Sequence, residues 1–192
     1  SRPSFHGRRG VTKQTRRRKR EESNSTDLEL RCFAPQMIVE AYRRAEAPLG
    51  DYRDRLGWTM GFIDILQRYF VAILANEHAG LGLDPPQPYS KLINKLRTPS
   101  LGDWGQAMEA FAQALLPRAH ELVVPEFPAI LVTLDEEGGF HRSVFTQHMV
   151  DLVDIRNARV CHEDGTIIPD EGTAKQILAE IRIPLRTICT SL

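Results

Sequence analysis

The sequence predicts an all-α protein, a helical bundle of about six helices with a disordered basic N-terminal leader. Apolar residues recur at helical spacing along most of the chain, and only residues 127–134 fit a strand as well as a helix. The composition, 42% apolar and 26% charged, is that of a globular protein with its own core. We therefore expect a leader over residues 1–30 and a single helical domain over residues 31–192.

Two helices are expected in the first part of the domain. Residues 35–47 are amphipathic and stop at Pro48-Leu49-Gly50. Asp51 then begins a longer helix that runs to about Ala79, where Gly80-Leu81-Gly82 ends it. The inward stripe of the longer helix contains Leu56, Met60, Ile63, Leu66, Phe70, Ile73 and Leu74.

The middle of the chain predicts shorter helices separated by prolines. Ser90 is a candidate N-cap for one of them. Ser100 and Asp103 have the spacing of a capping box at the start of the next, and Pro117 bends or ends that helix. The apolar stripe of this helix, between Asp103 and Pro117, consists of Trp104, Met108, Phe111 and Leu115.

The last third predicts a short helix over residues 127–134 and two longer ones. The first of the longer helices runs from about His141. The second is capped by Thr173 with Gln176 and kinked by Pro184. The core face of the first contains Val144, Phe145, Met149, Leu152 and Ile155.

The charge is unevenly distributed along the chain. Residues 1–20 hold nine basic side chains and no acidic one, whereas residues 21–192 hold the other 16 basic side chains and all 25 acidic ones. Such a leader cannot bury enough apolar surface to fold, and it suits a polyanion. An interdomain linker or a segment folding back on the acidic body are the alternatives. The candidate nucleic-acid-binding residues of the leader are Arg16, Arg17, Arg18, Lys19 and Arg20.

The three cysteines indicate a reducing, cytoplasmic location. Cys32, Cys161 and Cys189 are widely spaced and contain no CxxC pair, which also argues against structural zinc. No uninterrupted apolar run approaches the roughly 20 residues of a membrane span, so no membrane partner is expected. We predict no cofactor and no metal. Because the chain begins with Ser1, we expect further domains of a longer protein, processing or a tag.

The segment from Arg156 to His162 carries the chemistry that stands out. Arginine offers a planar fork of donors for a phosphate, and histidine exchanges a proton near neutral pH. Together they are able to cleave RNA without a metal, and Asn157 is suited to orienting either one. On a continuous helix, six residues turn through about 600° and leave the two side chains about 120° apart. They converge only if the helix loosens or a second subunit completes the site.

An all-helical domain with Arg156-Asn157, four residues and then His162 resembles the HEPN superfamily, over residues 140–162. The resemblance implies a bundle that forms homodimers and a metal-independent endoribonuclease site, in toxins, defence effectors or RNA-processing enzymes. It would make Arg156 and His162 catalytic, with Asn157 supporting them. Arg159, which lies between them, is a further candidate for contact with nucleic acid. The chain differs from the commoner motif in having Arg159 and Cys161 inside it and Glu163-Asp164 after it.

Two other interpretations remain open. Arg156-Asn157 and His162 would also serve as a helix C-terminal cap in a non-catalytic helical dimerisation or protein-interaction module of a multidomain signalling or defence protein. Alternatively, the basic leader is the functional part and the body is a dimerising scaffold.

Overall fold

The structure is a computed structural model that describes residues 35–46, 50–87, 100–160 and 169–190. These ranges contain six α-helices, one 3-10 helix and a two-stranded antiparallel sheet, which confirms the all-α class. The helices are α2 (Gln36–Glu46), α3 (Tyr52–Gly80), α5 (Leu101–Leu115), η1 (Leu116–Glu121), α6 (Phe127–Leu131), α7 (Val144–Arg159) and α8 (Glu171–Thr190), and the strands are β1 (Val132–Leu134) and β2 (Phe140–Arg142). The predicted leader and the predicted helix after Ser90 lie outside the described residues.

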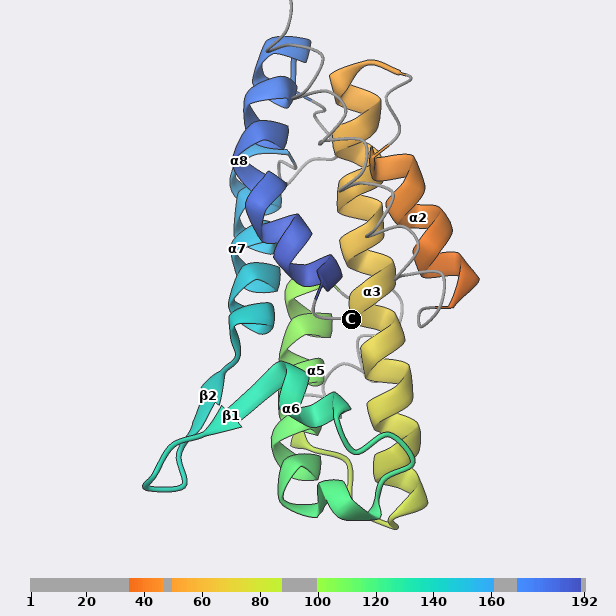
Figure 1. Ribbon diagram of the computed structural model, residues 1–192, viewed down its shortest axis with the longest axis vertical. Helices are drawn as coiled ribbons and strands as arrows, with labels where there is room; N and C mark the ends of the chain where they lie inside the picture. Colours follow the sequence, from red (N-terminus) through yellow and green to blue (C-terminus); the bar gives the residue numbers. More distant parts are fainter. Residues whose placement is uncertain (1–34, 47–49, 88–99, 161–168, 191–192) are drawn as a thin grey trace, which may run out of the picture.

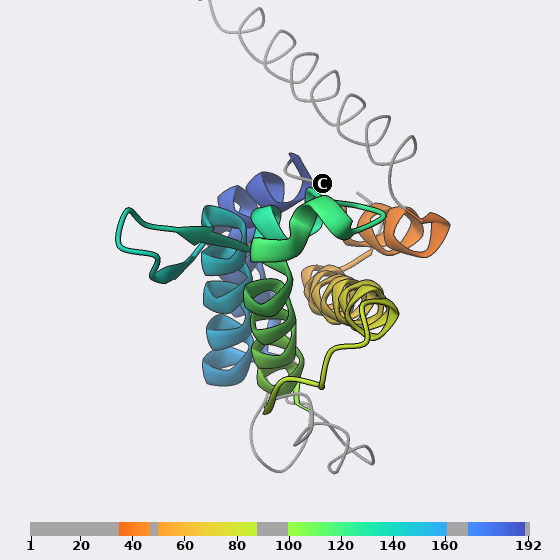
Figure 2. The ribbon, with the colours of Figure 1, turned by 90° about the horizontal axis from the view of Figure 1, so that it is seen from below.

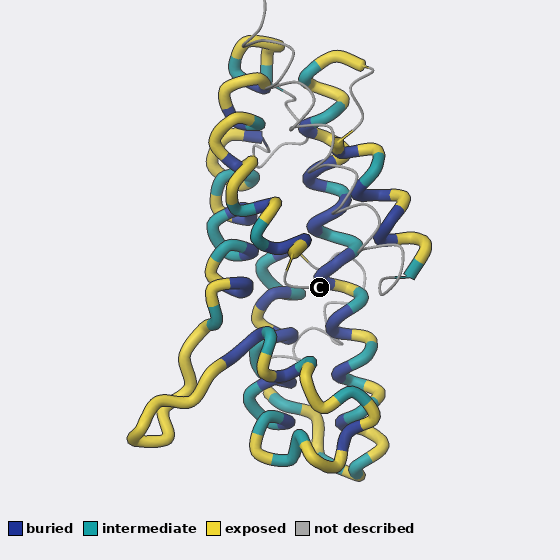
Figure 3. Tube along the Cα trace, in the orientation of Figure 1, coloured by how far each residue is buried: buried dark blue, intermediate teal, exposed yellow. Residues whose placement is uncertain are grey.

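Helix α3 runs along most of the length of the molecule (Figure 1). Seen along that axis, it lies between α2 on one side and α5, α7 and α8 on the other (Figure 2). Helices α2, α5 and α8 all pack extensively on α3, and α7 packs mainly on α8. The buried positions therefore follow the inner faces of the helices (Figure 3).

The ends of α3 follow from local sequence. The Asp51 side chain accepts a hydrogen bond from the backbone N–H of Asp54 at 2.8 Å, which satisfies a donor of the first turn. The helix ends at Gly80, and Gly82 follows in a left-handed conformation with φ +67°, which glycine adopts without strain. Between these ends the fully buried stripe includes Leu56, Phe62, Leu66, Phe70 and Leu74.

An aromatic cluster joins α3 to the second half of the chain. The Phe70 ring lies 5.4 Å from that of Phe127 in α6 and 5.5 Å from that of Phe145 in α7, measured between centroids. Such pairs add about 0.5–1.5 kcal/mol each beyond the burial of their area. The cluster therefore fixes α6 and α7 against the central helix.

Helix α3 is also long and apolar enough, by length and composition, to cross a membrane. Half of its apolar window is buried against the other helices, as in the core helix of a soluble protein, and the structure is compatible with a soluble protein.

The hairpin of β1 and β2 corrects the expectation for residues 127–142. Only residues 127–131 are helical, and His141 lies in β2, three residues before α7 begins. The cause is a tight turn in which the Asp135 carboxylate accepts from the backbone N–H groups of Glu137 and Gly139, while Gly138 takes a φ of +82°. The chain therefore reverses where helical periodicity predicted a helix start, and Val144 is 68% exposed instead of buried.

The expected helix caps and proline effects are partly confirmed. Ser100 and Asp103 form the predicted capping box of α5, and the chain after Leu115 tightens into η1, which contains Pro117. The start of α8 was predicted wrongly, because Asp170 caps it by accepting from the N–H and the hydroxyl of Thr173. Pro184 lies inside α8, whose second half turns away from the direction of its first half (Figure 1).

The start of α7 is held by two hydroxyl groups. Ser143 caps the helix by accepting from the N–H of Thr146 at 3.1 Å, and its hydroxyl donates to the carbonyl of Ile130. The buried hydroxyl of Thr146 donates to the carbonyl of Leu131 at 2.7 Å. These bonds tie α7 to the junction of α6 and β1.

We predict that Ser143→Ala destabilises the protein by about 2 kcal/mol and Ser100→Ala by about 1 kcal/mol, because only Ser143 also satisfies a carbonyl of another element. Urea denaturation of the two variants measures the difference. An equal or smaller loss for Ser143→Ala would contradict the role of that second bond.

His78 is a core residue, not the exposed helix cap that its position beside Gly80 suggests. It is 3% exposed, and its ring lies edge-on against Phe111 in α5, with the centroids 5.2 Å apart. Burial lowers the pKa of His78, the nearby Arg118 lowers it further, and Asp84 acts in the opposite direction. The folded protein therefore favours the neutral imidazole.

We expect the free energy of unfolding to fall as the pH drops below about 6.5, the pKa of a histidine in the unfolded chain, because the unfolded state then binds a proton that the folded state resists. His78→Gln should weaken this dependence, whereas His120→Gln, at a side chain 78% exposed, should leave it intact. Urea denaturation from pH 8 to pH 5 gives both slopes. Equal slopes for His78→Gln and the unchanged protein would refute the assignment.

Candidate functional site

The last turn of α7 carries Arg156, Asn157 and Arg159. The helix ends at Arg159, and the N–H of the next residue, Val160, donates to the carbonyl of Arg156 at 2.9 Å. The remaining predicted site residues, His162 and the basic residues from Arg16 to Arg20, lie outside the described residues. The structure therefore gives the positions of Arg156, Asn157 and Arg159 but not that of His162.

Arg156 is held by its neighbour Asn157. Its Nη1 donates to Oδ1 of Asn157 at 2.9 Å, which is the orienting role expected for the amide. Arg156 is half-buried, and no carboxylate among the described residues forms an ion pair with it. The other donors of its guanidinium fork are therefore free to bind an anionic group.

Arg159 has a different environment. Its Nη1 donates to Oε2 of Glu180 in α8, between side chains that are 36% and 53% exposed. The pair ties the end of α7 to α8. Because Glu180 neutralises it, Arg159 is less available to a phosphate than the sequence suggested.

The end of α7 falls inside the motif. The separation of 120° between Arg156 and His162 applies to a continuous helix, and α7 stops three residues before His162. Val160, the residue after the helix, is 5% exposed with φ −116°, and its N–H still donates to the carbonyl of Arg156. The convergence that the sequence analysis required depends on His162, which lies outside the described residues.

The end of α7 lies at the same end of the molecule as the starts of α3 and α8 (Figure 1). Three further cations gather there: Arg53 and Arg55 in α3 and Lys175 in α8. Sequence analysis missed them. The spacing of Tyr52 and Arg55 on one helix was visible, but Lys175 joins them only because α3 and α8 pack together.

The acidic side chains at this end are partly engaged. Asp51 caps α3, Asp170 caps α8, and Glu180 binds Arg159. The exposed carboxylates that form no such bond among the described residues include Glu46, Asp54, Asp154 and Glu171.

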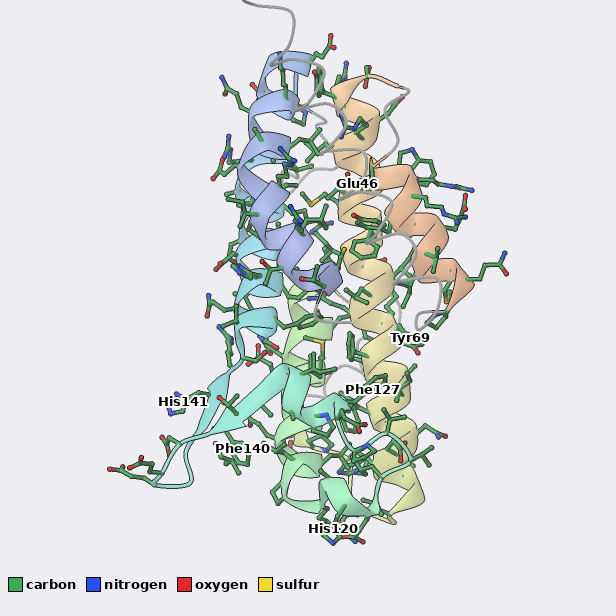
Figure 4. The ribbon with its side chains drawn as sticks, viewed as in Figure 1. Glu46, Tyr69, His120, Phe127, Phe140 and His141 are labelled. Atoms are coloured by element: carbon green, nitrogen blue, oxygen red, sulfur yellow. The ribbon has the colours of Figure 1, made fainter. Side chains whose placement is uncertain are left out.

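The opposite end of the molecule carries the exposed hairpin. Figure 4 shows Phe140, His141 and His120 there, away from the end of α7. His141 Nε2 lies 2.7 Å from Oδ2 of Asp135, and this bond, with the backbone N–H groups of the turn, lowers the pKa of the Asp135 carboxyl. The contact between His141 and Asp135 stabilises the turn of the hairpin. Among the described residues, no further catalytic side chain joins this pair.

The described residues offer only weaker candidates for a catalytic nucleophile and for a metal site. Cys189 is 3% exposed, and burial raises the pKa of its thiol, so it is a poor nucleophile. Within the same residues, no group of three or more His, Cys, Asp or Glu side chains is placed to hold a metal ion.

We predict that the pair of Arg159 and Glu180 contributes no more than about 1 kcal/mol, because both side chains are exposed. A double-mutant cycle with Arg159→Gln and Glu180→Gln, followed by urea denaturation, measures the coupling. A coupling well above that value would show that the pair is a major clamp between α7 and α8.

Comparisons with protein-family models, with curated proteins and with solved structures found no match. The case for a function therefore rests on the residues and the geometry described above.

Proposed function

We propose that this chain is a HEPN-like helical domain that binds RNA in the cytoplasm and cleaves it as a homodimer without a metal ion. Arg156 carries the proposal: it lies at the end of α7, its guanidinium is oriented by Asn157, and no carboxylate among the described residues neutralises it. Asn157 acts as a positioning residue. His162 would supply the proton transfer.

The reaction is an attack within the substrate. The ribose 2′-oxygen bonds to the adjacent phosphorus while an imidazole takes the 2′-hydroxyl proton. The bond from phosphorus to the 5′-oxygen breaks, and that oxygen receives a proton from a second imidazole or from water. The products are a 2′,3′-cyclic phosphate and a 5′-hydroxyl. Arg156 stabilises the negative charge that builds up on the phosphoryl oxygens.

A homodimer suits this chemistry because it brings two histidines to one phosphate, one as base and one as acid. The leader, with nine basic side chains and no acidic one in residues 1–20, would attract the RNA. The excess of acidic side chains in residues 21–192 would repel the RNA elsewhere, so its contacts with the body would be limited to the few cations without a carboxylate partner.

Cleavage of a fluorescent single-stranded RNA in EDTA tests the proposal. We expect Arg156→Ala and His162→Ala each to reduce the rate by about 100-fold or more, since proton transfer and charge stabilisation each contribute at least that much. The matched controls are Arg182→Ala and His120→Ala, which change exposed residues outside the motif. Thermal stability of every variant is measured in parallel.

Intact RNA over the full range of dose and time would refute the enzyme activity. If the unchanged protein cuts, mixing the inactive Arg156→Ala and His162→Ala variants tests the dimer. Recovery of about a quarter of the activity at equal amounts would follow from random pairing if each site draws its arginine and a single required histidine from different protomers. No recovery would follow if both residues of a site lie in one protomer, or if each phosphate needs a histidine from both protomers.

A non-catalytic interaction module is the second candidate, and the hairpin favours it. Leu134 and Phe140 face each other across β1 and β2 and are 48% and 39% exposed. The hairpin projects from the bundle in both views (Figures 1 and 2). Under this function, Leu134→Ser with Phe140→Ser abolishes self-association while motif variants have no effect.

A further inference from the structure

Two cations from different helices lie against one tyrosine ring where α3 and α8 begin. The Cζ atom of Arg55 lies 6.0 Å from the centroid of the Tyr52 ring, and Nζ of Lys175 lies 5.4 Å from it. Tyr52 is half-buried, Arg55 is half-buried and Lys175 is exposed. The ring therefore holds both cations at the edge of the core.

Neither cation is neutralised by the protein. No carboxylate among the described residues forms an ion pair with Arg55 or Lys175. The Nε atom of Arg55 is buried and has no hydrogen-bond acceptor there. A buried donor without an acceptor is costly, and native proteins rarely leave one unless a ligand, ion or water satisfies it.

The contacts with the ring do not remove that cost. An exposed cation–π contact contributes about 0.5–1 kcal/mol, and the Nε atom of Arg55 still lacks an acceptor among the described residues. Holding two like charges near one ring adds repulsion. An anion between the two cations would relieve the repulsion and accept from the guanidinium.

The donor groups of the cluster indicate which kind of anion fits it. A guanidinium fork and an ammonium group together suit the several oxygens of a phosphate better than a single carboxylate. The Tyr52 ring, over which both cations lie, holds them together for one phosphate. The backbone of a nucleic-acid strand supplies such a phosphate.

We propose that Arg55 and Lys175 bind a backbone phosphate of single-stranded RNA beside the Tyr52 ring, an assignment that rests on the proposed function. The subsite lies where α3 and α8 begin, at the same end of the molecule as the end of α7, whose last turn carries Arg156 (Figure 1). It would hold the strand away from the cleaved phosphate and contribute to affinity and not to the chemical step.

Binding of a 12-nucleotide single-stranded RNA, followed by fluorescence anisotropy at several KCl concentrations, tests the subsite in the full chain. We expect the double variant Arg55→Gln/Lys175→Gln to bind about tenfold more weakly. The slope of the logarithm of Kd against that of salt should lessen by about 0.7 for the lost phosphate contact. The control Arg118→Gln/Arg182→Gln also removes two arginines, one in η1 and one in α8, neither of which belongs to the cluster, and should stay within about threefold of the unchanged protein.

Changes at the tyrosine separate a structural role from binding. Tyr52→Phe keeps the ring and should keep the affinity, whereas Tyr52→Leu removes the ring that holds the two cations and should weaken binding. Unchanged affinity and salt slope in Arg55→Gln/Lys175→Gln would overturn the subsite, and so would an equal loss in the control. Loss of affinity together with unfolding, seen by circular dichroism, would show that the cluster serves the fold.

A second measurement keeps the subsite separable from the proposed function. Sodium phosphate, compared with NaCl at equal ionic strength, should raise the Tm of the unchanged protein by about 2–5 °C at saturation, and not that of the double variant. If phosphate stabilises the protein while RNA does not bind, the anion site stands and the proposed function fails. If neither binds, both fail.

Discussion

The buried stripe of α3 holds the other elements in place, because α2, α5 and α8 all pack on it. Its largest apolar residues are completely inaccessible, and Phe70 extends the contact to α6 and α7 through two further phenylalanines. The ends of the shorter helices are consequently fixed relative to the start of α3. The cations in α3 and α8 and the arginine at the end of α7 thus reach one end of the molecule through core packing, not through contacts with one another.

The fold was predictable where one residue pattern dominated. The stripe of α3, the capping box of Ser100 and Asp103 and the breaks at prolines depend on residues close in sequence, so they could be found without tertiary information. The hairpin was predictable only in part, because residues 127–134 fitted a strand as well as a helix. Residues 132–134 and 140–142 become strands because the side chain of Asp135 and the φ of Gly138 turn the chain between them.

The candidate site was likewise predictable only where the interacting residues are close in sequence. The sequence indicated that Asn157 is suited to orienting either Arg156 or His162, and the structure contains a bond from Arg156 to Asn157. It did not predict that Glu180 binds Arg159, since 21 residues separate them, or that Val160, directly after the helix, is buried in the core. The cluster of Tyr52, Arg55 and Lys175 was equally hidden, because it exists only once α3 and α8 pack together.

The central claim is that RNA binds at the end of the molecule where α3 and α8 begin and α7 ends. Hydrogen–deuterium exchange of the full chain, with and without a saturating single-stranded oligonucleotide, tests it directly. The account predicts protection in the first turns of α3 and α8 and in the last turn of α7. Protection confined to the hairpin of β1 and β2, or binding with no protection at the ends of α3, α7 and α8, would contradict it.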